Sequence, residues 1–280
     1  MRFLSFITNK QESTYGLHCD GGIVDLGKRM GDRYPDLKTL LALDATSGAK
    51  QYLTAPPDFR EDEISFLPVI PNPGKIICVG MNYADKCKEF SVENTAPTLF
   101  ARFPDSQTGH DCSLLKPACS NQFDYECELA VVVGKAGRAI SKENALAHVA
   151  GYSCYMDGSV RDWQYTWFTA AKNWPETGAF GPWLVTADEI PNPQQLNIRT
   201  YLNGRTMQNG NTQNMLYPVA TLISYISTFT SLSPGDVIIT GSPGGVGYKR
   251  TPQVFMKTGD VVEVEIEKIG RLRNRVSEVV

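Results

Sequence analysis

Residues 123–134 read Phe123-Asp124-Tyr125-Glu126-Cys127-Glu128-Leu129-Ala130-Val131-Val132-Val133-Gly134. Side chains alternate between the two faces of a β-strand. In an extended conformation, Asp124, Glu126 and Glu128 therefore share one face, with neighbouring carboxylates ~6.5 Å apart. Such a row can bind a hard divalent cation, because Mg²⁺ and Mn²⁺ prefer oxygen ligands. The alternative is a solvent-exposed acidic face on an antiparallel strand.

A second acidic cluster follows the apolar run 150–156 and reads Asp157-Gly158-Ser159-Val160-Arg161-Asp162-Trp163-Gln164. This pattern is typical of a strand end that turns into a loop or a short helix. Asp157 is therefore a candidate third ligand, and Arg161 and Gln164 are candidates for contact with a polar substrate. The alternative is a capped helix start that carries a surface arginine.

A glycine-rich segment follows a predicted strand at 236–239 and reads Thr240-Gly241-Ser242-Pro243-Gly244-Gly245-Val246-Gly247. A tight loop of this kind exposes backbone N–H groups and hydroxyls, which suit a carboxylate. Its spacing matches neither phosphate-loop fingerprint, so a nucleotide site is not indicated. A plain turn is the alternative.

Composition restricts the class of protein. The chain has 280 residues, 42% of them hydrophobic, and a formal charge of −3, which provides no electrostatic attraction to nucleic acid. No apolar run approaches the ~20 residues that span a bilayer. The seven cysteines form no C-x-x-C pair, which indicates reduced thiols, and no export signal is visible. We therefore expect a cytoplasmic protein without a nucleic-acid or membrane partner.

The order of turns and apolar runs predicts a mixed, β-rich fold in two parts. Residues 1–70 are expected to form a small N-terminal β-rich domain, and the proline-rich stretch 68–74 reads as a linker. Residues 75–280 are expected to form the catalytic domain, with a buried strand at 75–80 and a hairpin at 261–276. Helical periodicity is confined mainly to 142–148 and 217–228, too little to cover both faces of a parallel sheet.

The acidic and glycine-rich segments, together with Gly80-Met81-Asn82-Tyr83-Ala84-Asp85, 181–186 and 270–274, occur in an order that resembles the fumarylacetoacetate hydrolase family. The resemblance extends from about residue 75 to residue 276. It implies a catalytic domain built around a mixed β-roll, a homodimer, and a bound Mg²⁺ or Mn²⁺ ion, with Ca²⁺ as a further candidate.

The same resemblance implies roles for individual residues. Glu126, Glu128 and Asp157 match the metal ligands, and Lys172 matches a catalytic lysine near the metal. Three further residues match substrate-binding positions: Arg161, Gln164 and Ser242.

The segment after Asn82-Tyr83 departs from the family pattern. Glu89 is retained as a catalytic candidate, but Lys86 occupies the position where the family has a water-activating histidine. A lysine is a poor base unless burial or a neighbouring cation lowers its pKa. The alternative is a solvent-facing ion pair between Lys86 and Glu89, three residues apart on a helix. His110 follows a loop-like stretch and is a further candidate base.

These observations predict a divalent-metal-dependent hydrolase that cleaves a carbon–carbon bond of an acylpyruvate or related 1,3-diketo acid. A 2-oxo acid substrate can chelate a metal, which stabilises the enolate that forms when the adjacent bond breaks. The alternative is a metal-dependent lyase, such as an oxaloacetate decarboxylase or a hydratase, which does not need the histidine. A non-catalytic metal-binding homologue is the third hypothesis.

Overall fold

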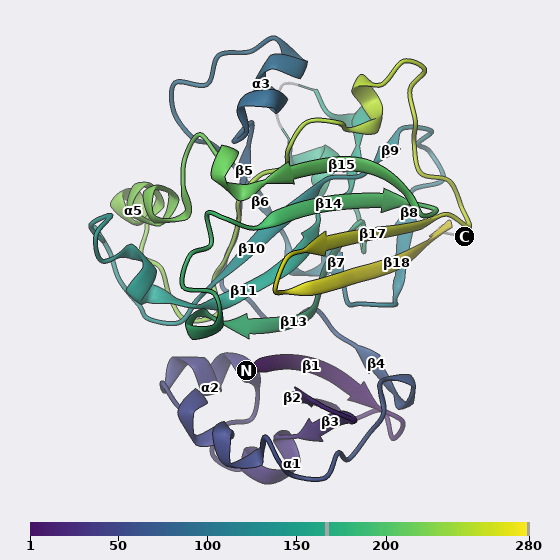
Figure 1. The fold of residues 1–280 in the computed structure, drawn as a ribbon. Coiled ribbons are helices and arrows are strands. Elements are labelled where there is room, and N and C mark those ends of the chain that lie inside the picture. Colours follow the sequence, from purple (N-terminus) through teal and green to yellow (C-terminus); the bar gives the residue numbers. More distant parts are fainter. Residues whose placement is uncertain (166–167, 279–280) are drawn as a thin grey trace.

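The computed structural model describes residues 1–165 and 168–278, and it confirms a mixed, β-rich fold (Figure 1). Its largest sheet has 11 strands within the described residues. Nine of these follow one another in the order β3 (Gly22–Asp25), β2 (Ser13–Cys19), β1 (Arg2–Thr8), β13 (Gly178–Thr186), β11 (Val149–Met156), β10 (Cys127–Val133), β16 (Val237–Ile239), β5 (Ile76–Gly80) and β6 (Thr98–Arg102). The other two, β4 (Ile64–Phe66) and β7 (Gln107–Thr108), pair with β1 and β13 respectively.

A second sheet faces the centre of the first. It contains β15 (Arg205–Asn211), β14 (Asn197–Leu202), β17 (Val261–Ile266), β18 (Gly270–Glu278) and β8 (Ser113–Lys116), in that order. The predicted hairpin at 261–276 is the antiparallel β17–β18 pair. Between the two sheets lies an apolar core that joins Leu129 and Val131 of β10 to Ile198 of β14 and Val264 of β17.

Strand β10 is buried on both faces, which excludes the solvent-exposed acidic strand. Leu129 and Val131 pack into the core between the sheets, and Ala130 and Val132 pack into a second core on the opposite face. The side chain of Glu128 therefore continues a face that is apolar further along the strand. The acidic residues lie at the start of this strand, where β9 (Phe123–Asp124) pairs with β12 (Ser159–Val160).

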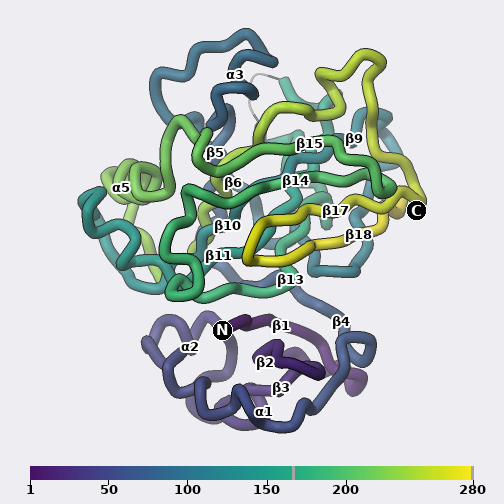
Figure 2. Tube along the Cα trace, viewed as in Figure 1, coloured from purple at the N-terminus to yellow at the C-terminus, as the bar shows by residue number. Residues whose placement is uncertain are grey.

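The N-terminal residues combine strands β1–β4 with two short helices, and they lie on the β13 side of the molecule (Figure 2). Strand β1 pairs with β13 through Arg2↔Val185 and Phe3↔Leu184, so these strands continue the large sheet. The second core extends across this junction and includes Phe3, Leu40 and Leu184. The division of the chain into residues 1–70 and 75–280 stays a prediction.

Helices are short in this fold. The α-helices are α1 (Gly27–Met30), α2 (Leu37–Ala42), α3 (Ala84–Phe90), α4 (Thr169–Lys172) and α5 (Val219–Phe229). The 3₁₀ turns are Thr46–Tyr52, Glu61–Glu63, Pro104–Ser106, Ala145–His148, Arg161–Trp163, Ala187–Glu189, Thr212–Asn214 and Gly247–Lys249. The helix predicted at 217–228 is therefore present as α5, whereas the prediction at 142–148 is wrong, because only a 3₁₀ turn forms before β11 begins. Among the described helices, none has the length and apolarity to cross a membrane.

Candidate functional site

Three carboxylates converge where β10 begins and β11 ends. Antiparallel pairing places Cys127 opposite Met156, and the Asp157 backbone N–H donates to the Glu126 carbonyl at 2.9 Å. One ligand oxygen from each of Glu126, Glu128 and Asp157 lies within 4.8 Å of the others. All three side chains are buried. The structure therefore brings together the three predicted ligands, whereas Asp124 is not part of the group and binds Arg161 at 2.9 Å.

Cations surround two members of this acidic triad (Glu126, Glu128 and Asp157). Lys172 and Arg102 both donate to Asp157. Arg161 donates to Glu126 at 2.5 Å. Although burial alone would raise the pKa of Glu126, the charges of Lys172, Lys86 and Arg161 hold it well below its usual range.

Glu128 is different, because no cation in the described part of the chain lies within ion-pair distance of its carboxylate. Its Oε2 accepts the backbone N–H of Gly241 at 2.5 Å. Burial, followed by the charges of Asp157 and Glu126, raises the pKa of Glu128 well above its usual range. A buried carboxylate in this position lacks a positive partner, so the donor set fits a divalent cation.

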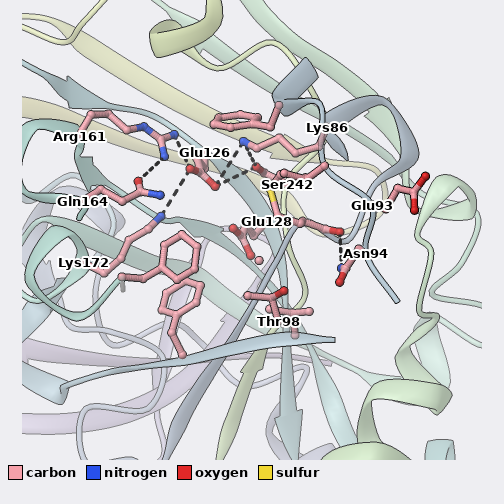
Figure 3. Close-up of a pocket in the computed structure, with 17 residues that line it drawn as sticks. Lys86, Glu93, Asn94, Thr98, Glu126, Glu128, Arg161, Gln164, Lys172 and Ser242 are labelled. Carbon is pink, nitrogen blue, oxygen red and sulfur yellow. Dashed lines mark hydrogen bonds and ion pairs between the residues drawn. The ribbon is translucent and has the colours of Figure 1, made fainter. Parts of the chain in front are cut away.

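Two members of the triad, Glu126 and Glu128, line a cavity of about 380 Å³, whereas the fully buried Asp157 is outside its lining. Figure 3 shows that the side chains of Lys86, Arg161, Lys172 and Ser242 point toward Glu126 from different elements. The remaining walls are mostly apolar and include Phe90, Val92, Phe100 and Phe168. Glu93 and Asn94 lie on the side away from Glu126 (Figure 3), and Thr98 also lines the cavity.

Helix α3 directs Lys86 into the cavity. The helix follows Asn82, whose buried side-chain amide donates to the Thr240 carbonyl at 2.8 Å and so ties its start to the glycine-rich loop. Gly241 has φ +95°, and a Cβ there would come within 2.8 Å of the Asn82 Cβ. Glycine is therefore required for this close approach.

Lys86 is 4% exposed, so the solvent-facing ion pair with Glu89 is wrong. Its Nζ donates to Ser242 Oγ at 3.2 Å and lies 3.7 Å from Glu126 Oε2. Burial lowers the pKa of Lys86, partly opposed by the charge of Glu126. Glu89 is outside the residues that line the cavity and accepts the Gly245 backbone N–H at 3.1 Å. Burial raises the pKa of Glu89.

The predicted substrate-binding residues all line the cavity. Arg161 is held by Asp124, Glu126 and Gln164, the last at 2.9 Å. Ser242 donates to Glu126 Oε2 at 3.0 Å.

The candidate base His110 lies elsewhere. Its ring packs edge-on against Phe66, and its Nδ1 accepts the Arg273 backbone N–H at 3.1 Å. It is absent from the described lining of the cavity. Trp163 and Trp174 pack edge to face with ring centroids 5.1 Å apart, and Trp167 lies outside the described residues.

Sequence reasoning missed Arg102, which forms the Asp157 ion pair from β6 with a side chain that is 0% exposed. A signal was present: Arg102 is a single charge at the end of the run Leu99-Phe100-Ala101. A charged residue that is buried needs a partner, but the pattern does not identify that partner.

Comparison with known proteins places this site in context. Residues 75–277 match the family model described as fumarylacetoacetate (FAA) hydrolase C-terminal. The chain is 41% identical over 226 residues to the mitochondrial oxaloacetate tautomerase FAHD2A of Bos taurus, which covers 79% of this chain and 72% of that protein. It is 33% identical to the solved fumarylacetoacetate hydrolase of Exiguobacterium antarcticum, with a TM-score of 0.88 and full coverage of both chains.

A further solved structure contains ligands. The maleylpyruvate hydrolase of Sphingobium sp. SYK-6, in complex with manganese(II) ion and pyruvate, has a TM-score of 0.84 and 25% identity over the full length of both chains. The fold expected from the resemblance is therefore confirmed. Since the family model covers residues 75–277, which include the acidic triad, Lys86 and the glycine-rich loop, the chain belongs to the fumarylacetoacetate hydrolase family.

Proposed function

We propose that this protein is a divalent-metal-dependent enzyme that interconverts the keto and enol forms of oxaloacetate. The observation that carries the proposal is the position of an amine, Lys86 Nζ, beside Ser242 and Glu126 in the cavity that Glu126 and Glu128 line. No histidine is among the described residues that line this cavity. The similarity to an oxaloacetate tautomerase supports the same reaction.

Glu126, Glu128 and Asp157 would hold the ion, with Mg²⁺ or Mn²⁺ as the expected metal. When bound, a divalent cation supplies positive charge at the keto oxygen of a 2-oxo acid and so favours loss of a proton from the adjacent carbon. Lys172 donates to Oδ2 of Asp157, and Arg102 donates to Oδ1. Their contacts fix the orientation of that carboxylate before any substrate arrives.

Lys86 is the group placed to carry the proton. A neutral amine accepts a proton from the carbon next to the keto group, and the resulting ammonium returns one proton to the enolate oxygen. Only one C–H bond and one O–H bond change, so no water is consumed. Ser242 accepts a hydrogen bond from Lys86 Nζ at 3.2 Å and limits where the amine can lie.

Hydrolysis of an acylpyruvate is the second candidate, and the apolar part of the cavity lining favours it. The apolar wall formed by Phe90, Val92, Phe100 and Phe168 offers contacts that a small polar acid such as oxaloacetate would not use. A longer acyl group would bury apolar surface against these rings. The similarity to a maleylpyruvate hydrolase supports this candidate.

One experiment separates the candidates. The purified chain is given enol oxaloacetate, keto oxaloacetate and a series of acylpyruvates, each with Mg²⁺, with Mn²⁺ and with EDTA. Loss of the enol absorbance reports tautomerisation, and mass spectrometry identifies any pyruvate or free acid. Metal-dependent acceleration of the enol–keto conversion without new products is expected.

Other results would identify the other functions. Pyruvate from oxaloacetate would indicate a decarboxylase, and pyruvate plus a carboxylic acid from an acylpyruvate would indicate the hydrolase. Tight binding of an analogue such as oxalate without any turnover would indicate the non-catalytic homologue. The homodimer and the cytoplasmic location stay predictions, to be checked by light scattering and by fractionation.

A further inference from the structure

The side-chain amide of Gln208 has hydrogen-bond partners on three segments, two of which also carry residues of the site. Gln208 belongs to β15 and is 1% exposed. Its Oε1 accepts the Cys127 backbone N–H at 2.9 Å and the Thr200 hydroxyl at 2.8 Å. Its Nε2 donates to the Pro243 carbonyl at 2.7 Å. Gln208 does not line the cavity, so any effect that it has on the site is indirect.

The two backbone partners of Gln208 are next to residues of the site. Cys127 separates Glu126 from Glu128 in the sequence, and Pro243 follows Ser242. Ser242 donates to Glu126 at 3.0 Å, and Gly241 donates to Glu128 at 2.5 Å. The amide therefore connects the strand that carries two carboxylates to the loop that supplies a hydrogen bond to each of them.

An amide satisfies this position because it combines an acceptor and a donor in one planar group. Its acceptor pairs the Cys127 N–H, which would otherwise be a buried orphan donor, and its donor pairs the Pro243 carbonyl. Strand β15 also packs closely on the loop, since a Cβ at Gly210 would lie 2.8 Å from the Pro243 Cβ. A side chain without both functions would leave one segment unpaired.

We propose that Gln208 is a positioning residue that sets the separation of Glu126 and Glu128 from the glycine-rich loop, and through them the affinity for a divalent cation. The inference rests on the metal-dependent function proposed above. Residues that orient metal ligands typically change affinity or activity by 10–100-fold when replaced. The expected effect of removing the amide is a loss of Mn²⁺ affinity in that range.

The test compares Gln208→Met with a buried amide elsewhere. Asn274 in β18 is also 1% exposed, and it donates to the carbonyls of Gly109 and Cys112 at 2.8 and 2.9 Å, away from the cavity lining. Asn274→Leu is therefore the matched control for loss of a buried amide. Isothermal titration calorimetry gives the dissociation constant for Mn²⁺ of each variant, and melting in EDTA gives its stability.

Both variants are expected to melt at lower temperature, and only Gln208→Met is expected to bind Mn²⁺ 10–100-fold more weakly. Equal Mn²⁺ affinity in Gln208→Met and wild type would overturn the inference alone. Absence of Mn²⁺ binding by the wild type would overturn the proposed function as well. If Gln208→Met does not fold, Gln208→Asn replaces it, because this variant keeps an amide that is one methylene too short to reach both Cys127 and Pro243. Unchanged affinity in Gln208→Asn would refute the positioning role.

Discussion

Replacement of Arg102 by Met should strongly destabilise the protein, because it leaves the buried carboxylate of Asp157 without its guanidinium partner. The Arg102 side chain is 0% exposed, and so is Asp157, which it contacts at 2.6 Å. The guanidinium also donates to the Gly158 carbonyl, to the Ser106 hydroxyl and carbonyl, and to the Thr177 hydroxyl. Met fills a similar volume but supplies none of these donors.

The magnitude follows from the cost of leaving one buried charge without its partner. Breaking a buried ion pair in this way typically costs about 3–5 kcal/mol in the free energy of unfolding. For a chain of this size, each kcal/mol corresponds to a shift of about 2–4 °C in Tm, so a fall of about 6–20 °C is expected. Lys172 still contacts Asp157, which places the result toward the lower end.

The assay is thermal melting followed by circular dichroism in EDTA, so that metal binding does not mask the loss. Arg271→Met is the matched control, since Arg271 pairs with Glu265 and Glu263 through a side chain that is 47% exposed. An exposed pair contributes at most about 1 kcal/mol. Adding Asp157→Asn to Arg102→Met should recover part of the loss, because it removes the charge that lost its guanidinium partner, while Lys172 keeps Glu126 at 3.5 Å. Equal Tm values for Arg102→Met, Arg271→Met and wild type would refute the reasoning.

Three further predictions concern the site and its surroundings. Glu128→Gln should abolish the rise in Tm that Mn²⁺ produces in the wild type. The Tm of this variant in EDTA should be equal to that of the wild type or higher, because Glu128 is a buried carboxylate without a cation partner. A retained Mn²⁺ response would contradict its role as a ligand. Lys86→Met should lower the rate of oxaloacetate tautomerisation by about 10²–10⁴-fold without removing the rise in Tm that Mn²⁺ produces. Lys88 is exposed on the same helix, so Lys88→Met is the control. Equal rates in both variants would show that Lys86 carries no proton. Burial lowers the pKa of His110 from its ordinary value of 6.5, so its contribution to stability is full above pH 6.5 and is lost as the pH falls through the lowered pKa. Urea unfolding between pH 7.5 and 5 should therefore show that His110→Gln loses less free energy of unfolding on acidification than the wild type. Identical pH profiles would contradict this.

Local patterns in the sequence were sufficient for the acidic strand and the elements around it. The period-two alternation at 123–134 correctly grouped Glu126 with Glu128, because side-chain direction in a strand depends on position along it. It did not hold for Asp124, which is outside the group because β9 ends at Asp124 and β10 begins only at Cys127. The helix at 217–228 and the hairpin at 261–276 were also predicted, since both have their own periodicity and turn residues. The segment 142–148 was mispredicted, because its few apolar residues form a 3₁₀ turn at Ala145–His148 that packs against α5.

The tertiary structure alone decided which side chains meet at the site. Lys86 and Ser242 are 156 residues apart, and their contact depends on the parallel pairing of β5 with β16, which sets α3 beside the glycine-rich loop. Arg102 and Asp157 are 55 residues apart, and no spacing rule relates them. Burial is also a property of the tertiary structure: Glu126 and Glu128 lie inside the protein and not on a solvent-exposed face. Hydrophobic periodicity is a local property of the chain, whereas the partners of a buried charge are set by strand order and packing between distant segments.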